Sequence, residues 1–531
     1  MSRRARLANL ARGVSRSFAA PRERAPFLES AARASSSSFA SASDAPAFEK
    51  RFAVVGSGPA GMYAALALTK TFQGSRVDVY ERYPTPFGLV RFGVAPDHAE
   101  TKLVTNKFNE TLTTRDDVRF FGNVQLGRDV ALGELCDGYH GVVLACGTSG
   151  DRKLEVPGEE ANRGVLSARE FVAWFNGDPE HGIGSETHAA VVEALTSSSM
   201  REDGRRTAAH VAVIGVGNVA IDCARILLRD KDALAKTDIC EHALEVLRKH
   251  PVDNVSVIGR RGPAQASFSP KELRELLNLP DVRVVIPEEE FLLAPEDEAE
   301  LAENRPRRRA YEAMTKRLAA GNPETNKTLT FRFLSSPLGF EGTDDGVLRS
   351  MKLGRNELVG RAGSRKSISS GETEDIPTVM ALRSVGYRAE EIKMDVEDTS
   401  SSKLELPFDQ VRRVVPNEYG AVKISAEADE CVPGLYVTGW LKRGPTGIIG
   451  TNLTCAEETV AKMASDFASN PPDERKLLDV ESILARRGTR VVTGADWHKL
   501  DALERERGAS VGKPRSKFTS IGEMLKALED H

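Results

Sequence analysis

The sequence predicts an α/β protein made of two three-layer domains, in which parallel strands alternate with helices. Two strand–turn–helix units with glycine-rich turns carry this prediction, at residues 52–68 and 210–228. A third strand–turn–helix unit, at 434–465, lacks the glycine pattern. A chain of 531 residues is long enough for two or three domains, and strands that alternate with helices favour parallel sheets.

The first unit has the pattern of a dinucleotide site. The apolar run 52–55 precedes the GSGPAG motif at 56–61, and a helix follows from Ala60 to about Lys70. In this G-x-G-x-x-G pattern, Gly56 permits a tight turn and Gly58 lets a pyrophosphate approach the backbone. The next strand, 76–80, ends at Glu81, whose carboxylate can accept hydrogen bonds from the adenosine ribose. The pattern therefore predicts a nucleotide-binding site, rather than a turn that needs glycine only for its own structure.

The second unit resembles the first but ends in basic residues. The strand 211–214 is followed by GVGNVA at 215–220 and a helix to about Arg229. The next strand, 255–258, leads into Arg260 and Arg261 where an NAD site would have an acid. Arginines there neutralise the 2′-phosphate, which favours NADPH over NADH, the alternative being a solvated basic pair on a turn. Glu272 follows Ser269 in a capping-box pattern, so it is either a helix cap or a residue near the NADP ribose.

Two further segments suit a flavin. Residues 84–98 (PTPFGLVRFGVAPDH) are too rich in glycine and proline for regular structure and too apolar for a solvated loop. They form either a buried irregular connection or a wall around an isoalloxazine ring. After the strand 435–438, the segment GWLKRGPTGIIG predicts a helix starting near Gly447 whose amides face the flavin pyrimidine edge. Trp440 is placed for stacking on the cofactor, or else is a core aromatic.

The N-terminal 48 residues differ from the rest of the chain. Residues 1–50 carry a net charge of +5 within a chain of net −4, and they are rich in Arg, Ser and Ala. This composition predicts a disordered transit peptide, mitochondrial rather than plastid because of the arginine density, with an ordinary disordered tail as the alternative. The acidic body excludes general nucleic-acid binding, and the lack of a long apolar run allows at most a peripheral contact with the inner membrane. The six cysteines form no closely spaced pair, so we expect no metal, cluster or redox dithiol.

Other segments are expected to lie outside the two domains. The composition predicts a surface insertion at 182–210 and a Ser/Gly/Glu-rich loop at 360–376. A polar appendage follows at 467–531.

GSGPAG, PFGLVRFGVAPDH, GVGNVAIDCARILL, GRRGP and GWLKRGPTGII occur in this order. In these motifs the chain resembles the mitochondrial adrenodoxin reductase family, NADPH–ferredoxin reductases of the glutathione-reductase-like type. The resemblance covers about residues 50–465. It implies two Rossmann-like domains, with an NADP domain (151–387) inserted into a split FAD domain (49–150 and 388–466). It also implies that the tail after about residue 470 is absent from animal members.

The resemblance also assigns site residues. It implies a catalytic pair of His98 and Asp222, although Asp222 is equally placed as a helix-packing residue. It implies a ferredoxin-docking patch with Arg305 and Arg309, where a solvated face is the alternative. The FAD contacts it implies are Gly56, Gly58, Ala60, Glu81, Leu89, Val124, Trp440, Gly447, Ile448 and Ile449. The NADP contacts it implies are Val216, Gly217, Asn218, Val219, Arg260, Arg261, Glu272 and Gly447.

The implied reaction is hydride transfer from NADPH to FAD, followed by single-electron transfer to an acidic [2Fe–2S] ferredoxin. The family suggests a monomer in the mitochondrial matrix. A flavin monooxygenase and a glutamate-synthase-like reductase module are alternatives. The latter would need cluster-binding cysteines before the first glycine motif, and residues 1–50 contain none. A non-catalytic dinucleotide sensor is the third alternative.

Overall fold

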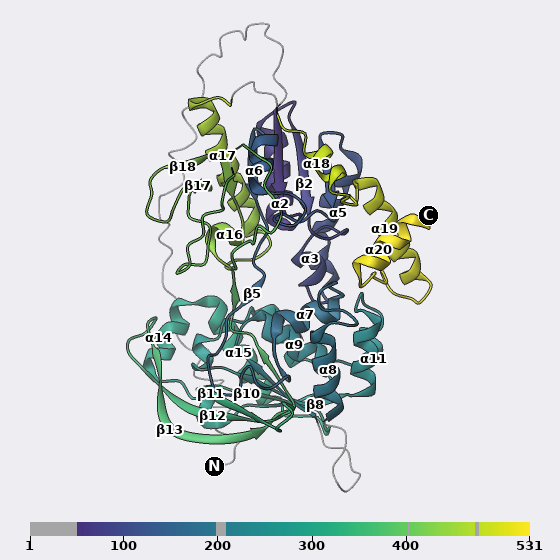
Figure 1. Cartoon of the computed structure of the whole chain (residues 1–531). Helices are drawn as coiled ribbons and strands as arrows, with labels where there is room; N and C mark the ends of the chain where they lie inside the picture. The colour runs from purple at the N-terminus through teal and green to yellow at the C-terminus, as the bar shows by residue number, and fades with distance from the viewer. Residues whose placement is uncertain (1–49, 198–208, 402, 473–476, 531) are drawn as a thin grey trace.

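The computed structural model describes residues 50–197, 209–401, 403–472 and 477–530. The predicted transit peptide, 1–48, lies outside these residues. The described chain forms two bodies, one above the other in Figure 1, each built on a sheet of mainly parallel strands. Among the described residues, no helix is both long and apolar enough to span a membrane. The predicted α/β class is confirmed.

The upper body is built on a seven-stranded sheet with the order β16-β17-β18-β4-β1-β2-β3. Pairing is parallel from β18 to β3, whereas β17 and β16 join one edge antiparallel. The strands are β1 (Arg51–Val55), β2 (Arg76–Glu81), β3 (Val118–Gly122), β4 (Gly141–Leu144), β16 (Asn417–Glu418), β17 (Ala421–Lys423) and β18 (Cys431–Val437). The helices are α2 (Pro59–Thr71), α3 (Leu89–Phe92), α4 (Ala99–Lys102), α5 (Val104–Thr114), α6 (Leu132–Gly138), α16 (Trp440–Arg443) and α17 (Thr451–Ser469).

Successive side chains of β1 enter different core clusters, as strand geometry requires. Phe52 and Val54 pack in the cluster that contains the apolar faces of α2 and α17. Ala53 and Val55 pack on the other face, in the cluster that includes α6. The sheet therefore separates two apolar layers, which is the three-layer arrangement that the sequence predicts.

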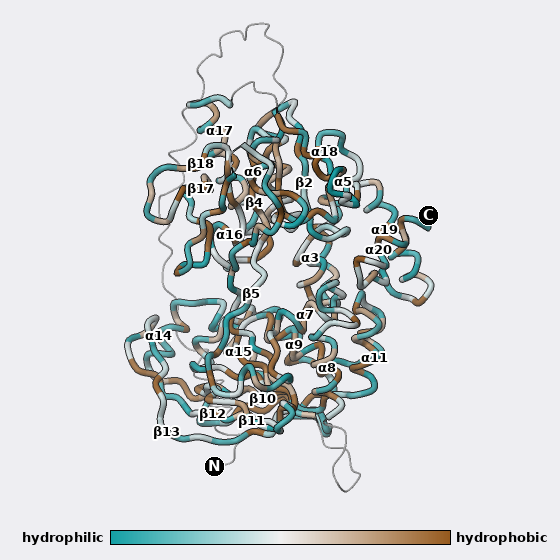
Figure 2. The backbone as a smooth tube through the Cα atoms, viewed as in Figure 1, coloured by the Kyte–Doolittle hydropathy of each residue, from teal (hydrophilic) through white to brown (hydrophobic). Residues whose placement is uncertain are grey.

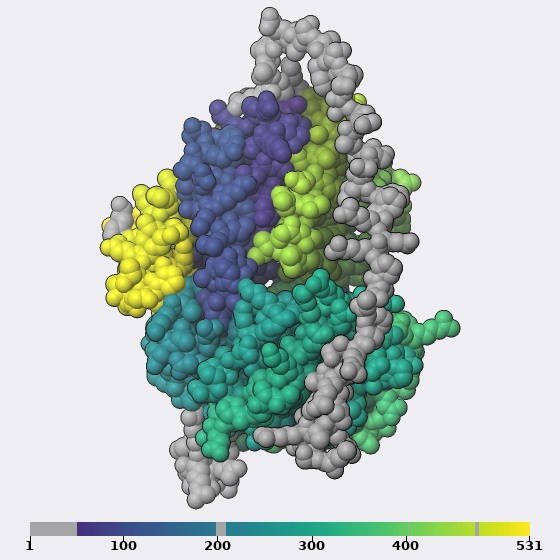
Figure 3. All heavy atoms as spheres, turned by 180° about the vertical axis from the view of Figure 1, so that it is seen from behind, coloured from purple at the N-terminus to yellow at the C-terminus, as the bar shows by residue number. Residues whose placement is uncertain are grey.

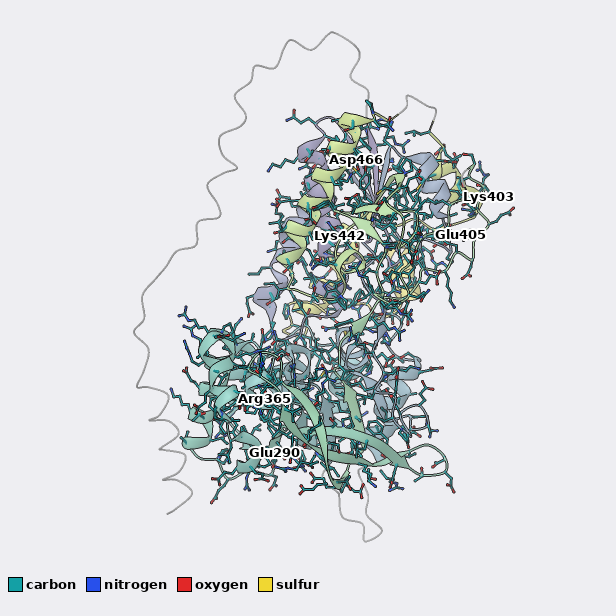
Figure 4. All side chains as sticks on the ribbon, turned by 90° about the vertical axis from the view of Figure 1, so that its left-hand side faces the viewer. Glu290, Arg365, Lys403, Glu405, Lys442 and Asp466 are labelled. Atoms are coloured by element: carbon teal, nitrogen blue, oxygen red, sulfur yellow. The ribbon has the colours of Figure 1, made fainter. Side chains whose placement is uncertain are left out.

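Helix α17 begins at Thr451, four residues later than the sequence predicts, because residues 447–450 still form the turn that enters it. Polar contacts fix this helix on the sheet. The Tyr436 hydroxyl of β18 donates to Asp466 Oδ2 at 3.0 Å. Lys442 Nζ contacts Glu458 Oε2 at 2.6 Å, and Figure 4 shows Lys442 and Asp466 on the same body.

The lower body contains a fully parallel six-stranded sheet with the order β6-β14-β7-β8-β10-β9. The strands are β6 (Val165–Ser167), β7 (Ala209–Ile214), β8 (Val252–Ile258), β9 (Arg283–Val285), β10 (Thr328–Arg332) and β14 (Met380–Arg383). The helices are α7 (Ala168–Asn176), α8 (Glu186–Ser197), α9 (Asn218–Leu228), α10 (Lys231–Leu234), α11 (Glu241–Lys249), α12 (Pro270–Leu277), α13 (Glu288–Phe291), α14 (Pro295–Glu303) and α15 (Arg305–Ala319), with a short 3-10 turn at Pro263–Gln265.

The third layer of this body is a sheet rather than helices. Val211 and Val213 of β7 pack in the helical cluster, whereas Ala212 and Ile214 pack against Phe340 and other residues of an antiparallel sheet. That sheet consists of β11 (Ser335–Gly342), β12 (Leu348–Val359) and β13 (Lys366–Pro377). Both bodies hold their apolar residues inside (Figure 2).

The prediction of a loop at 360–376 is wrong. The segment 360–376 contains most of β13, which pairs with β12 along the sheet edge. Its residues are mostly exposed on both faces, so backbone pairing forms the strand without the apolar alternation that would reveal it in the sequence (Figure 2). The predicted insertion at 182–210 contains α8, which buries Val191 and Leu195. Residues 198–208 of that insertion lie outside the described residues.

A short antiparallel pair, β5 (Gly150–Asp151) with β15 (Tyr387–Arg388), connects the two bodies. The chain passes from the upper to the lower body through β5 and returns through β15 (Figure 1). The C-terminal helices α18 (Val480–Arg486), α19 (Gly494–Ala509) and α20 (Ile521–Glu529) pack on the upper body, where Gly122 and Val492 exchange backbone hydrogen bonds.

Candidate functional site

The first glycine-rich turn has the shape that its sequence predicts. Gly56 has φ +107°, and a Cβ there would lie 2.5 Å from the carbonyl oxygen of Ala145. A Cβ at Gly61 would lie 1.8 Å from the carbonyl oxygen of Gly56, so only glycine lets α2 sit this close to β1. A Cβ at Gly58 would meet no other described atom within 4 Å. Gly58 therefore leaves open space at the N-terminus of α2, where a phosphate group finds free N–H groups.

Glu81 lies at the end of β2, next to this turn. Its Oε2 accepts hydrogen bonds from the Ser57 amide at 3.0 Å and the Ser57 hydroxyl at 2.6 Å. Its Oε1 accepts a longer bond, 3.3 Å, from the Tyr83 amide. A carboxylate has about four acceptor positions, so Glu81 can hold the turn and still accept from a ribose hydroxyl.

The segment 439–450 meets the first turn from the other side. Gly439 has φ +70°, and a Cβ there would lie 2.6 Å from the Cβ of Ala60. Leu89 on α3 and Ile448 are both exposed, the latter by 76 %. Val124 instead has its side chain buried in the core, and its amide donates to the Glu81 carbonyl oxygen.

The unpaired donor groups of Arg443 indicate that a large anionic ligand fits at this position. Its Nη2 donates to Asn452 Oδ1 at 3.2 Å. Its Nε and Nη1 are buried without a hydrogen-bond partner among the described residues. Buried N–H groups are rarely left without an acceptor, and the ring and phosphates of FAD would bring acceptors to a site with exposed apolar side chains. The residues present therefore fit FAD.

The second glycine-rich turn opens into a cleft of about 730 Å³. Val216, Gly217, Asn218, Val219, Arg260 and Arg261 all line it. Four other basic residues also line the cleft: Arg152, Lys153, Arg169 and Arg383. Three of these are paired: Arg169 with Asp151 and Arg383 with Glu159, each at 2.8 Å, and Lys153 with Glu160. The surplus of positive charge suits a dinucleotide that carries a third phosphate.

Arg260 and Arg261 lie where the sequence places the 2′-phosphate. Arg260 is exposed and Arg261 is half-buried. Burial lowers the pKa of Arg261, and the nearby Arg260 and Arg307 lower it further. An arginine beside two other cations is stabilised when an anion binds among them. This arrangement fits the phosphate of NADP.

Glu272 lies outside the lining of this cleft. The Ser269 hydroxyl accepts from the Glu272 amide at 3.2 Å, so half of the predicted capping box is present. The Glu272 carboxylate does not return to the Ser269 amide, which donates to Asn218 Oδ1 at 2.7 Å. Instead, Glu272 Oε2 faces His98 Nε2 at 3.2 Å.

His98 lies between the two bodies and is 6 % exposed. Its Nδ1 is 4.0 Å from Asp222 Oδ1, too far for a hydrogen bond. Its Nε2 forms a hydrogen bond of 2.7 Å with Glu275 Oε2. Burial raises the pKa values of both Asp222 and Glu272. The structure thus places the predicted pair in one cluster, but it adds Glu275 as the direct partner of His98.

This cluster has the spacing of a metal site, because ligand atoms of His98, Asp222 and Glu272 lie within 4.8 Å of one another. Arg225 already occupies it: its Nη2 donates to Asp222 Oδ1 at 2.7 Å, and its Nη1 lies 3.7 Å from Glu272. A guanidinium at this point supplies the positive charge that a cation would otherwise bring.

Arg225 also connects the two bodies. Its Nε and Nη2 donate to the carboxylate of Asp97 at 2.7 and 3.0 Å, and Arg229 donates to the same carboxylate. The side chains of Arg225 and Asp97 are 0 % and 1 % exposed. Asp97 belongs to the segment 84–98 and Arg225 to α9, so this buried pair fixes one body against the other.

The two candidate sites adjoin. Tyr387 lines the basic cleft, and its ring packs on that of Trp440 with centroids 5.0 Å apart. The Trp440 Nε1 donates to the carbonyl oxygen of Thr446, which holds the indole over the segment before Gly447. The cleft therefore adjoins the segment that is predicted to contact the flavin.

Arg305 and Arg309 lie apart from these sites, on α15. Both are exposed and lie one helical turn apart. Their neighbours are engaged, because Arg307 lies 3.7 Å from Glu300 and Arg308 lies 3.9 Å from Glu312.

Comparison with known proteins agrees with this geometry. Residues 50–275 match the family model described as pyridine nucleotide-disulphide oxidoreductase. A protein of Arabidopsis thaliana named "NADPH:adrenodoxin oxidoreductase, mitochondrial" is 39 % identical over 504 residues, covering 92 % of this chain and 97 % of that protein. The chain belongs to the NADPH:adrenodoxin oxidoreductase family. The mouse member is 40 % identical and covers 90 % of this chain and 91 % of its own length.

A solved structure of a bacterial relative supports the same assignment. The structure titled "Mycobacterium tuberculosis FprA in complex with NADPH" superposes with a TM-score of 0.78 at 36 % identity, covering 91 % of this chain and all of that chain. The resemblance that the motifs predict is confirmed.

One expectation about the family is wrong. Residues 1–466 amount to about 88 % of the chain, whereas the match to the mouse protein covers 90 % of it. At least part of the segment 467–531 is therefore shared with an animal member. The structure gives a reason, because this segment buries Trp497, Leu500 and Glu504 against the upper body.

The sequence analysis missed several residues of this region. Asp97 and Arg225 were not singled out, although each is a charged residue in a predominantly apolar stretch, which is a signal for a buried ion pair. Glu275 lies three residues after Glu272 on the same helix, so both lie on one face of it. That polar face is a signal for a partner such as His98. Tyr387 falls at a predicted domain junction, and no local pattern reveals that its ring contacts Trp440.

Proposed function

We propose that this protein is an oxidoreductase that passes electrons from NADPH through FAD to a [2Fe–2S] ferredoxin. The closeness of the two sites carries this proposal: Tyr387 lines the basic cleft of the lower body and packs on Trp440 of the upper body. Family membership supports the choice of cofactors and acceptor. When bound, NADPH supplies a hydride and FAD accepts the electron pair and passes electrons on singly.

The chain itself binds and orients the two cofactors and excludes water from them. The open space at Gly58 and the amides of α2 receive the FAD pyrophosphate, and Glu81 accepts from the ribose. Leu89, Ile448 and Ile449 supply an apolar surface, and Gly56 and Ala60 shape the turn beneath it. The buried Arg443 Nε and Nη1 supply donors to this site. Gly447, with φ +86°, lets the segment before α17 turn towards both cofactors.

The lower body holds NADPH. Val216, Gly217, Asn218 and Val219 form the turn that faces its pyrophosphate, and Arg260 and Arg261 neutralise its 2′-phosphate. The buried His98 lies among the partly buried Asp222, Glu272 and Glu275 at the junction of the bodies, where it is placed to hold a proton near the nicotinamide. Glu272 therefore acts through His98 rather than on the ribose.

The NADPH assignment is tested by replacing both Arg260 and Arg261 with alanine. Each arginine that binds a phosphate directly contributes about 1.5–3 kcal/mol, so the KM for NADPH should rise at least about tenfold. The KM for NADH should change little. Equal effects on the two substrates would remove the 2′-phosphate assignment.

The whole proposal is tested with purified full-length protein. We expect flavin absorbance, reduction of the flavin by NADPH, and cytochrome c reduction that depends on added mitochondrial ferredoxin. A colourless protein that cannot be reconstituted with FAD would refute it. NADPH oxidation that ferredoxin does not accelerate would favour a monooxygenase or another acceptor.

Location and partner are further parts of the proposal. The arginine-rich segment 1–48 and the mitochondrial names of several relatives support the mitochondrial matrix, with the plastid as the alternative. The exposed Arg305 and Arg309 support an acidic ferredoxin, because cations steer an acidic partner towards its site. The protein is proposed to act as a monomer. Import of a fusion of residues 1–48 into isolated mitochondria and plastids tests the location.

A further inference from the structure

The C-terminal segment 494–529 contacts both bodies at once. In Figure 1 its helices α19 and α20 lie beside α3 and α5 and above α11. Figure 3 shows the same segment from behind, in yellow, against blue residues of the upper body and blue-green residues of the lower body. Lys513 Nζ donates to the Ile239 carbonyl oxygen and contacts Glu241 Oε2 at 2.8 Å, which confirms the contact with the lower body.

On the upper body, this segment holds α3 and the residues before it. The ring of Trp497 packs edge-on against Phe87, with centroids 5.7 Å apart. Glu504, which has a fully buried side chain, accepts a hydrogen bond from Arg91 Nη1 at 2.9 Å and another from Arg515 at 2.8 Å. Phe87 and Arg91 flank Leu89, the predicted flavin contact. This C-terminal tail therefore packs behind residues 84–98, the predicted flavin wall.

Lys517 joins this support to the lower body. Its side chain is 1 % exposed. Its Nζ donates to the Arg91 carbonyl oxygen at 3.3 Å and to the Asn176 carbonyl oxygen at the end of α7 at 3.1 Å. It also lies 3.2 Å from Asp238 Oδ2. One ammonium group thus touches the flavin wall and two parts of the lower body.

Asp238 receives a second cation from the upper body. Lys102 Nζ of α4 donates to both of its oxygens, at 2.7 and 2.8 Å. Burying two ammonium groups and a carboxylate costs desolvation energy that their attraction only partly repays, so such a cluster contributes geometry more than stability. Bodies joined by short linkers move relative to one another unless their interface is fixed, and here a fixed interface lies directly behind the flavin wall.

We propose that Lys517 is a positioning residue for hydride transfer, which fixes α3 against the NADP-binding body and so sets how closely the nicotinamide approaches the flavin. This inference rests on the proposed function. Lys517 touches neither cofactor site directly and acts through Arg91 and Asp238. Hydride transfer is sensitive to small displacements, so loosening this contact slows the reaction without removing either binding site.

The test uses the full-length holoprotein with Lys517→Met. Anaerobic stopped-flow should show flavin reduction by NADPH slowed by about tenfold or more, with a weaker long-wavelength charge-transfer band. The FAD content and the affinity for NADP⁺ should stay within about twofold of wild type, because neither cofactor site contains Lys517. Amide hydrogen exchange in Leu89–Gly93 should be faster, and Lys517→Arg should restore much of the rate. Arg505→Met is the matched control, because the Arg505 side chain is exposed and pairs with Asp501 within the tail.

An unchanged reduction rate and charge-transfer band in folded Lys517→Met would overturn the inference. If Lys517→Met does not fold or loses FAD, Asp238→Asn decides, since asparagine keeps the packing volume of aspartate. A slowed rate in folded Asp238→Asn supports the inference, and a wild-type rate in it overturns the inference. Wild-type protein whose flavin NADPH does not reduce would instead refute the proposed function, so the two failures can be told apart.

Discussion

Replacing Arg225 with methionine should destabilise the protein far more than the same change at Arg229. Methionine keeps much of the arginine volume and removes the charge. Arg225 has a fully buried side chain and makes two hydrogen bonds to Asp97 and one to Asp222. The substitution leaves Asp97, which is 1 % exposed, with Arg229 as its remaining cation.

The magnitude follows from this burial. Removing one partner of a buried ion pair costs about 3–5 kcal/mol, because the other charge stays in the interior without compensation. Unfolding entropy near 60 °C is about 2.1 cal/mol/K per residue, so a folded part of about 480 residues loses about 1 °C of Tm per kcal/mol if it unfolds as one unit. We therefore expect Arg225→Met to lower the Tm by about 3–5 °C.

Thermal unfolding of the holoprotein, followed by circular dichroism, measures this. Arg229 is 34 % exposed, so Arg229→Met should lower the Tm by about 1 °C or less. Asp97→Asn combined with Arg225→Met should cost less than the sum of the two single changes, because both remove the same interaction. A Tm for Arg225→Met within 1 °C of wild type, or equal to that of Arg229→Met, would show that the pair does not hold the bodies together.

Three further predictions follow from other residues. Gly58→Ala should leave the Tm of the apoprotein unchanged but lower the FAD content, whereas Gly61→Ala should lower the Tm itself, because only the second Cβ would collide with described atoms; equal effects would contradict the assignment of Gly58. Burial lowers the pKa of His242 to about 4, from about 6.5 in the unfolded chain. Above pH 6.5 the buried neutral ring costs the folded state nothing, and as pH falls from 6.5 towards 4 the free energy of unfolding falls by about 3 kcal/mol in all. His242→Gln should flatten the fall in unfolding free energy over that range, whereas the exposed His498→Gln should not, and an unaltered slope in His242→Gln would refute the assignment. Arg305→Glu should slow ferredoxin-dependent cytochrome c reduction by about tenfold at low ionic strength while ferricyanide reduction stays unchanged, and unchanged ferredoxin kinetics would reject docking at α15.

The sequence predicts those parts of the site that depend on local geometry. Gly56 is required by its positive φ and Gly61 by its contact with the Gly56 carbonyl oxygen, both within one strand–turn–helix unit, so the motif contains the information needed. The same holds for Arg260 and Arg261, which follow a strand at a position that the fold reserves for the ribose. Local pattern fails where a contact joins distant segments: Lys517 and Asp238 are nearly 280 residues apart, and nothing near either one reveals the other. It also fails for β13, because an exposed edge strand needs only backbone partners.

The positions of the buried charges bear on how the two bodies work together. The predicted flavin wall, 84–98, could have been held to the lower body by apolar packing alone, which would have been at least as stable. Instead its far end carries Asp97, fixed by Arg225, and its middle carries Arg91, whose carbonyl oxygen accepts from Lys517. Apolar surfaces can slide past one another with little change in energy, whereas hydrogen-bonded charges hold one register because any displacement leaves a buried ion unpaired. A wall held in this way at two points is fixed to α7 and α9, and α9 begins at the glycine-rich turn that lines the basic cleft. If Lys517 positions α3 as proposed, the protein sets the distance between the two cofactors before either one binds.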